Sequence, residues 1–327
     1  FSGEVAPLWN EQLAEEAKEY FGKHEKLKAL LQQPRQLSPS YQIHLSEAVA
    51  NFGLYLAGPI VECFDGQLIY AGGDDVLALL PAENALRCAR VLRMAFRGDP
   101  QLSDKFEGAI RAREEQWGFV GLSRDPEKLK RLRRFIPVGY PLIVPGKRAD
   151  ISAGIAIGHM HSPLQNLVQA ARDAEKRAKK DEAKGGYGKS AFAVSLFKRS
   201  GETIQWGAKW DTAAIELAQC FEDNFGEGKP LSGRFPYALA DLLRKYDTPT
   251  RKDGKLEPFR IGRNGEFDAV AVIRKDLEHV VRQRGKNVPE SFVATANNYL
   301  EQCQGRRLDD FLGPFLTVTF VTRGGEA

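Results

Sequence analysis

The chain has 327 residues, of which 43% are hydrophobic and 28% are charged. These values are typical of a soluble globular protein with about two domains. The net charge of +4 is too small to indicate a nucleic-acid-binding protein by itself. Because no run of about 18 apolar residues and no basic-then-apolar leader is present, we expect neither a membrane span nor a secretory signal and predict a cytoplasmic protein. The widely spaced cysteines are expected to be buried thiols: Cys63, Cys88, Cys220 and Cys303.

Two helical patterns precede the first strands. Residues 10–33 are highly charged, with apolar residues at roughly helical spacing. Ser38 and Pro39 then supply the N-cap and first position of a second helix. Its apolar face is formed by Leu45, Val49, Phe52, Leu56 and Ile60. Gly58-Pro59 falls inside this pattern and is expected to kink the helix or end it early. Since the chain starts with Phe1 rather than Met, we expect it to be part of a longer protein.

Residues 67–80 are typical of a β-hairpin with a charged tip, Gly72-Gly73-Asp74-Asp75, between two apolar runs. The glycines supply the positive φ angles of a tight turn and leave room for a nucleotide near the backbone. Adjacent carboxylates repel each other unless a cation binds them, so the pair predicts a divalent metal site. Mg²⁺ is the first candidate because one or two carboxylates and substrate phosphates usually hold it. The alternative is an ordinary polar turn.

An insertion is expected between two palm-like halves. Residues 81–96 predict an amphipathic helix, whereas residues 97–148 show no clean period and predict irregular structure. The basic run over residues 128–134 either contacts phosphate or forms a solvated helix face. Residues 151–159 then predict a strand.

The following helix is expected to begin after Ser162-Pro163 and to end at about Lys184. Its outer face predicts the i,i+4 ion pairs Asp173–Arg177 and Glu175–Lys179. A second hairpin is expected over residues 190–210, turning at Ser200-Gly201.

The order of these elements predicts an α+β fold in which residues 1–210 form a ferredoxin-like palm. Only the strand before the first helix is missing from a βαββαβ order. Helical patterns then predict an α-helical C-terminal domain over residues 211–327. Its basic excess, 16 Lys and Arg against 10 Asp and Glu over residues 229–307, could serve RNA or solubility, but the scattered charges favour protein contact.

Four segments resemble the polymerase-like large subunit of type III CRISPR–Cas effector complexes of the Cmr type. They are YAGGDDVLALLP over residues 70–81, SAGIAIGH over 152–159, KRSGE over 198–202 and PLSGRFPY over 230–237. The resemblance implies a palm related to nucleotide cyclases and GGDEF diguanylate cyclases. It also implies synthesis of cyclic oligoadenylate from ATP with Mg²⁺ or Mn²⁺, in a complex with other subunits, guide RNA and target RNA.

The resemblance also implies roles for individual residues. Asp74 and Asp75 would bind metal and act in catalysis, with Gly72 and Gly73 beside the nucleotide. Lys179 matches the lysine that the GGDEF family presents to a triphosphate, and Lys189 is the second candidate. The alternative for Lys179 is its ion pair with Glu175.

Some expected parts of the family are missing from this sequence. The aspartate-bearing strand that completes the metal site would end at about residue 1. The amino-terminal HD nuclease and first palm are also absent, and without a His-Asp dipeptide this piece is not expected to cut DNA.

Two short motifs and two other functions remain to be weighed. Gly188-Lys189-Ser190 resembles the end of a P-loop, but the glycine required at 183 is alanine. His159 and His161 have metal-binding spacing, but a structural or base-contacting role is favoured because no third ligand is near.

The alternative functions are a non-catalytic scaffold of the effector complex and a GTP-dependent diguanylate cyclase. The helical tail and the second aspartate of the motif disfavour the cyclase.

Overall fold

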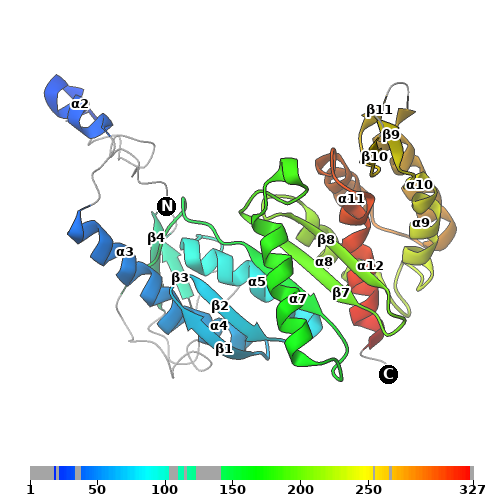
Figure 1. Ribbon diagram of the computed structural model, residues 1–327, viewed down its shortest axis with the longest axis horizontal. Helices are drawn as coiled ribbons and strands as arrows, with labels where there is room; N and C mark the ends of the chain where they lie inside the picture. The colour runs from blue at the N-terminus through cyan, green and yellow to red at the C-terminus, as the bar shows by residue number, and fades with distance from the viewer. Residues whose placement is uncertain are drawn as a thin grey trace.

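The computed structural model confirms an α+β fold, with two groups of helices and strands (Figure 1). The structure describes residues 18–19, 22–33, 38–102, 110–113, 116–122, 141–252, 255–264 and 267–324. No helix among these residues is long and apolar enough to cross a membrane. Cys88 and Cys303 are buried thiols as expected, whereas Cys63 and Cys220 are only half-buried.

The first helical segment keeps its predicted start but not its predicted interruption. After α2 (Glu25–Gln32), helix α3 (Pro39–Asn51) begins at Ser38, whose Oγ accepts a hydrogen bond from the Tyr41 amide at 3.2 Å. The chain then forms a π-helix, η1 (Phe52–Ala57), and continues as α4 (Gly58–Cys63). Of the two expected outcomes, an early end at Pro59 is therefore wrong, and a kink stays a prediction. The wider π-helical turn precedes the proline, and Pro59 starts a new α-helical ladder that does not need its missing N–H.

The hairpin and the next helix pack against this segment. Strands β1 (Gln67–Gly72) and β2 (Asp75–Leu79) pair antiparallel, and α5 (Ala82–Arg97) ends at Gly98 in a left-handed conformation. One face of the hairpin contributes Leu68, Ala71 and Val76 to a core that is centred on η1, α4 and α5. The hairpin tip is thereby fixed to a helical layer on one side only.

The insertion is more regular than its sequence suggests. Strands β3 (Ile110–Arg113), β4 (Gln116–Leu122) and β5 (Leu142–Ile143) form a three-stranded antiparallel sheet. The expectation of irregular structure is wrong for these residues because Val120, Leu142 and Val144 are buried in the core of the hairpin region. The basic run over residues 128–134 lies outside the described residues.

A second sheet carries the long helix α7. Strand β6 (Ala153–Ile157) pairs parallel to β7 (Ala191–Phe197), which pairs antiparallel to β8 (Thr203–Lys209). Helix α7 (Leu164–Lys179) begins two residues after Ser162, with Pro163 at the N-cap position, so Ser162 is not the cap. It also ends five residues earlier than predicted. A 3₁₀ turn, η2 (Glu182–Lys184), follows because the Asp181 side chain caps it by accepting from the Ala183 amide at 3.0 Å.

The C-terminal part of the chain is largely helical, as its helical patterns predict. The helices are α8 (Ala214–Asn224), α9 (Phe235–Leu243), the 3₁₀ turn η3 (Arg244–Tyr246), α10 (Ala269–Arg284), α11 (Glu290–Gln302) and α12 (Leu308–Gly324). Two short hairpins not expected from the sequence separate α9 from α10: β9 (Thr250–Lys252) with β10 (Lys255–Glu257), and β11 (Arg263–Asn264) with β12 (Phe267–Asp268).

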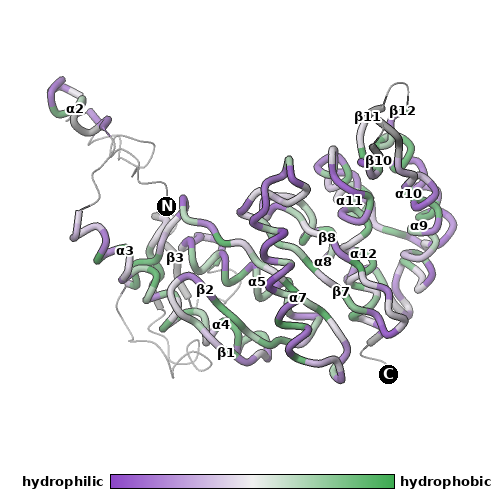
Figure 2. Tube along the Cα trace, in the orientation of Figure 1, coloured by the Kyte–Doolittle hydropathy of each residue, from purple (hydrophilic) through white to green (hydrophobic). Residues whose placement is uncertain are grey.

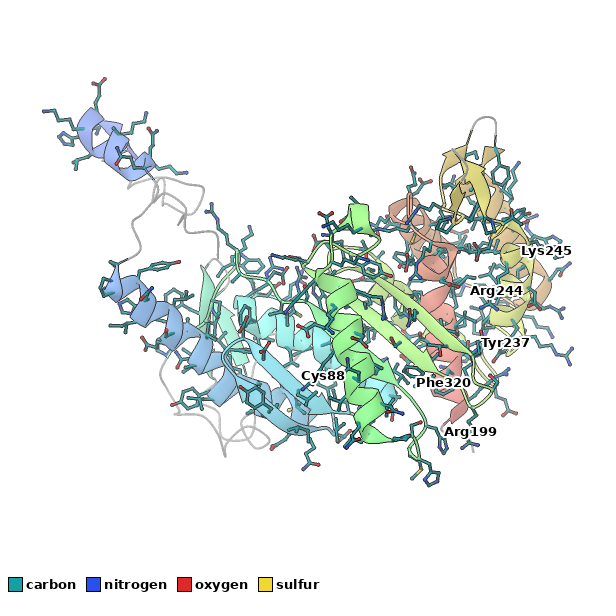
Figure 3. All side chains as sticks on the ribbon, viewed as in Figure 1. Cys88, Arg199, Tyr237, Arg244, Lys245 and Phe320 are labelled. Atoms are coloured by element: carbon teal, nitrogen blue, oxygen red, sulfur yellow. The ribbon has the colours of Figure 1, made fainter. Side chains whose placement is uncertain are left out.

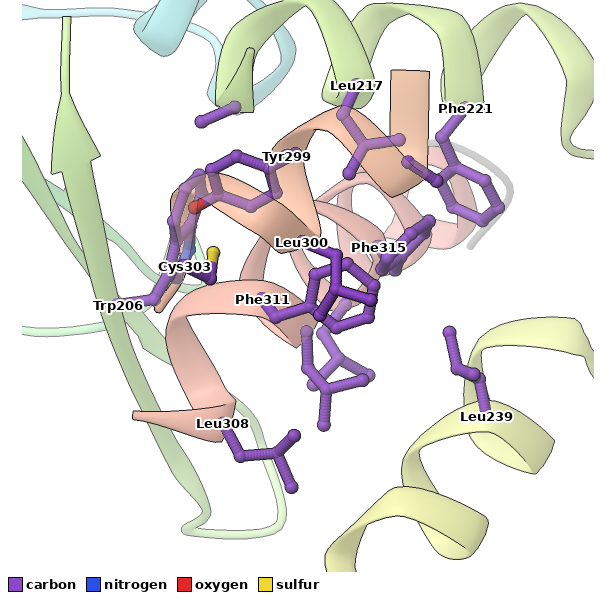
Figure 4. Packing of buried hydrophobic residues seen from close by; sticks show 14 of the residues in the cluster. Trp206, Leu217, Phe221, Leu239, Tyr299, Leu300, Cys303, Leu308, Phe311 and Phe315 are labelled. Atoms are coloured by element: carbon purple, nitrogen blue, oxygen red, sulfur yellow. The ribbon is translucent and has the colours of Figure 1, made fainter. Parts of the chain in front are cut away.

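One hydrophobic core joins the second sheet to these helices. Trp206 of β8, Tyr299 of α11, and Phe311 and Phe315 of α12 belong to the same buried cluster (Figure 4). In Figure 2, green stretches of these segments alternate with white and purple ones. The division between palm and helical domain at residue 210 stays a prediction, although buried contacts cross it. Within the described residues, no strand pairing joins β1–β2 to the β6–β7–β8 sheet.

Candidate nucleotide-binding site

The tip of the β1–β2 hairpin is a two-residue turn. Gly72 pairs with Asp75, so Gly73 and Asp74 form the loop. Only Gly73 has a positive φ, +64°, which is the pattern of a turn that requires glycine at its first position. A Cβ at Gly73 would meet nothing within 4 Å, so the residue is needed for its conformation and not for close packing.

Tyr70 crosses the space beside Gly72. A Cβ built on Gly72 would lie 2.2 Å from the Tyr70 hydroxyl oxygen and 2.5 Å from the ring carbon that carries it. The ring is 56% exposed, so it can rotate away without loss of core packing. The ring therefore occupies the space where a side chain at Gly72 would lie. Sequence analysis missed Tyr70, although its position two residues before Gly72 places both on one face of the strand.

Asp74 and Asp75 are both exposed at this tip. Because both carboxylates are open to water, neither needs a buried partner. Among the residues that the structure describes, no third His, Cys, Asp or Glu joins them in a group that could hold a metal. The donor set nevertheless fits Mg²⁺, which needs only one or two carboxylates when phosphates and water supply the remaining oxygens.

Lys179 lies at the C-terminal end of α7 within the electrostatic field of these carboxylates. Its Nζ is 2.5 Å from Glu175 Oε1, which confirms the predicted ion pair. The hydrogen bond with Glu175 raises the pKa of Lys179, and the charges of Glu175, Asp75 and Asp74 raise it further against the effect of burial. Three predicted site residues from two distant parts of the chain therefore interact electrostatically: Asp74, Asp75 and Lys179.

Lys189 shares an open depression with Lys179. Its lining residues are Lys179, Asp181, Glu182, Gly188 and Lys189, so two acids lie beside the two lysines. Asp74 and Asp75 do not line it. The two lysines predicted to bind a nucleotide thus line one depression, and the charges of Asp74 and Asp75 act on one of them, Lys179.

One predicted ion pair, Asp173–Arg177, differs in the structure. Asp173 binds Lys176 Nζ at 3.1 Å instead of Arg177, so that predicted pair is wrong. Arg177 turns inward and donates to the Val194 carbonyl at 3.1 Å and to Ser195 Oγ at 2.9 Å. The sheet offers this guanidinium two acceptors out of water, where a hydrogen bond to a charged group is stronger than an exposed ion pair.

His159 and His161 lie at the opposite end of α7. Their ring centroids are 5.1 Å apart, and Arg199 contacts His159 Nε2 from the β7–β8 turn (Figure 3). Partial desolvation and the Arg199 cation lower the pKa of His159. No third potential metal ligand joins this pair among the described residues.

Comparison with known proteins agrees with this architecture. Residues 13–107 match the model of the Cas10/Cmr2 second palm domain. The "CRISPR system Cmr subunit Cmr2" of Pyrococcus furiosus is 30% identical over 216 residues, which are 64% of this chain and 19% of that protein. Residues 13–107 are thus similar to the second palm of Cas10/Cmr2, and the hairpin of Asp74 and Asp75 lies inside these matched residues.

Two further similarities agree with this one. The Cmr2 subunit of Saccharolobus solfataricus is 37% identical over 62 residues, 19% of this chain and 6% of that protein. A solved structure described as type III-B Cmr-beta in the apo state is similar with a TM-score of 0.52 and 16% sequence identity. The similarity covers 95% of this chain and 29% of the chain in that structure. That similarity concerns the fold alone. The chain spans about a fifth of the length of the Pyrococcus relative that it matches.

Proposed function

We propose that this chain carries the site of a metal-dependent nucleotidyltransferase that makes cyclic oligoadenylate from ATP. In this proposal it acts in a cytoplasmic type III effector complex, with other subunits as partners, when guide RNA captures target RNA. The observation that supports it best is that the acidic pair lies in the hairpin inside the residues similar to the Cas10/Cmr2 second palm, while Lys179 and Lys189 line one depression.

Asp74 and Asp75 would hold Mg²⁺ or Mn²⁺ at the hairpin tip, with a further carboxylate expected from a preceding strand. When bound, the metal ions supply Lewis-acid activation of a ribose hydroxyl and neutralisation of the triphosphate. The exposed tip leaves space for phosphate oxygens to complete the coordination shell.

Lys179 and Lys189 would contact the triphosphate. Every backbone N–H from Ala183 to Gly186 and from Gly188 to Lys189 donates to a protein oxygen, so the loop offers phosphate its lysine side chains and not these amides. Lys179 would exchange its bond to Glu175 for one to phosphate, and the nearby carboxylates keep its ammonium protonated during this exchange. The chain thus contributes positioning and charge neutralisation, the main sources of catalysis in phosphoryl transfer.

The test is to change Asp74 and Asp75 to Asn in the assembled complex and to follow conversion of ATP to oligoadenylate in the presence of target RNA. We expect product to fall at least about a hundredfold because metal coordination is lost while the fold is kept. Glu62→Gln is the matched control, since Glu62 is an exposed carboxylate of the same palm on α4. Undiminished product in the double variant would overturn the proposal.

Titration of Mn²⁺ with ATP or GTP separates the alternatives. Preferential binding of ATP supports the proposal. Absence of binding would leave the scaffold function, and preference for GTP would indicate a diguanylate cyclase.

A further inference from the structure

The loop over residues 181–190, which we call the Lys189 loop, adopts an unfavourable backbone conformation at its end. Lys189 has a φ of +64° and Ser190 a φ of +45°, both in the left-handed region that residues with a Cβ rarely adopt. Such a conformation persists only when surrounding contacts determine it. The direction in which Lys189 enters the depression therefore depends on what holds this loop.

Local bonds hold one side of the loop. The Lys189 amide donates to the Ala178 carbonyl at 3.0 Å, and the Gly188 amide donates to the Lys180 carbonyl at 2.7 Å. Lys209 of β8 donates from Nζ to the carbonyls of Gly188 and Lys189 at 3.0 and 3.1 Å. These bonds join the loop to the end of α7 and to the neighbouring strand.

The segment that leads into α12 holds the other side. One guanidinium nitrogen of Arg306 donates to the Gly186 carbonyl at 3.0 Å, and the other lies 3.2 Å from Glu182 Oε2. Its guanidinium carbon also lies 5.4 Å from the centre of the Tyr187 ring. Glu182 lines the depression, so one arginine, 120 residues away from Gly186 in sequence, contacts three residues of the loop.

A buried carboxylate fixes the same segment. Asp310 is 3% exposed and accepts from the Tyr187 hydroxyl at 2.6 Å, from the Gly207 amide at 3.2 Å and from the Arg307 amide at 3.2 Å. Arg307 in turn donates to the Tyr187 hydroxyl at 3.2 Å and to the Gln205 carbonyl at 2.9 Å. A buried network with satisfied partners is rigid and strongly position-dependent, so it transmits the position of α12 to Tyr187.

We propose that Arg306, Arg307 and Asp310 are positioning residues for the nucleotide site, through which the C-terminal helices set the direction of Lys189 toward the triphosphate. The inference rests on the proposed function, because it assigns a cause for the placement of one of its phosphate-binding lysines. It also makes the phosphate site sensitive to the helices, since a shift of the first turn of α12 moves Gly186, Tyr187 and Glu182 together.

The test compares two arginines with the same type of contacts. Arg306→Gln in the assembled complex should raise KM for ATP about fivefold to tenfold, with kcat changed by less than about twofold, because binding and not chemistry is affected. Arg323→Gln is the control. Arg323 also donates to a backbone carbonyl, that of Gly233, at 2.6 Å, and its guanidinium carbon lies 5.1 Å from the centre of the Tyr237 ring. It lies at the C-terminal end of α12, whereas Arg306 precedes the N-terminal end of that helix. Arg323→Gln should leave KM unchanged.

Two further variants separate positioning from general stability. Tyr187→Phe removes only the hydroxyl between Asp310 and Arg307 and should raise KM in the same direction, whereas Arg306→Lys should recover part of the effect through Glu182. An unchanged KM in Arg306→Gln and Tyr187→Phe, with product still formed by the parent complex, would overturn this inference and leave the proposed function intact. Absence of product and of ATP binding in the parent complex would overturn both.

Discussion

The two sides of the candidate site are built in opposite ways. The hairpin tip of Asp74 and Asp75 is exposed, and Gly73 has open space around it. The Lys189 loop is bonded to α7, β8 and the start of α12, with a buried carboxylate behind it. The difference indicates that the acidic side can adjust to metal and substrate, whereas the basic side is fixed in advance by tertiary contacts.

The largest expected effect is on the fixed side. Asp310→Asn should lower the free energy of unfolding by about 3 kcal/mol, because Arg307 and Tyr187 lose the charge of a buried partner. Denaturant unfolding followed by fluorescence of the buried Trp206 measures the change. A loss below about 1 kcal/mol would show that the network contributes no more than one ordinary hydrogen bond.

Asp309 provides the control because burial raises the pKa of its carboxyl group, whereas an ion pair lowers the pKa of an acid. A raised folded-state pKa means that the folded protein binds the proton more tightly than the unfolded chain does, so this residue's contribution to stability falls as pH rises through that range. Asp309→Asn should therefore leave stability at pH 7 unchanged or higher, and should remove that part of the pH dependence. Destabilisation by this variant would contradict the assignment.

The next largest effect is a difference in stability between two glycine variants of the Lys189 loop. It separates the cost of a steric clash from the cost of a positive φ. A Cβ on Gly186 would lie 2.1 Å from the Lys180 carbonyl oxygen, so Gly186→Ala should cost about 2 kcal/mol and displace the loop. Gly185 has a φ of +81° and no atom within 4 Å of a built Cβ, so Gly185→Ala should cost only about 1 kcal/mol. Thermal unfolding of both variants checks the order, and equal costs would contradict the close approach.

A smaller effect is expected at the exposed tip. Gly73→Ala should cost about 1 kcal/mol through backbone strain alone, because nothing surrounds its Cβ. Gly201→Ala, in the β7–β8 turn with a φ of +84° and equally open space, should cost the same. We expect oligoadenylate synthesis to fall only in Gly73→Ala, since only that turn carries the carboxylates. Equal activity of the two variants would show that the tip does not need its turn geometry.

The smallest stability effect concerns Glu175, which is half-buried beside Lys179. Glu175→Gln should change the free energy of unfolding by only a few tenths of a kcal/mol, as for other surface ion pairs. NMR titration should nevertheless show the pKa of Lys179 falling toward its ordinary value, because its main hydrogen-bond partner is lost. Asp173→Asn, which removes the partner of Lys176 one turn away, should leave it unchanged. If the pKa of Lys179 fell by the same amount in Asp173→Asn, the shift would reflect the overall charge and not the bond to Glu175.

Local patterns determined most elements of this protein and the residues of its candidate site. The apolar periodicity of residues 269–284 and the Gly-Gly turn before two aspartates each carry their structure within a few neighbouring residues. The α+β class, the hairpin and the family resemblance could therefore be obtained from the sequence.

Tertiary structure decided the contacts that join distant segments. Arg177 turned from its predicted partner to the sheet, α7 ended at Lys179, and Asp310 met Tyr187 across 123 residues. No local pattern encodes these outcomes, because each depends on which acceptor is buried next to which donor once the chain has packed. The sequence by itself determined which residues could bind a nucleotide, and the packing of α12 against the second sheet decided how one of them is held.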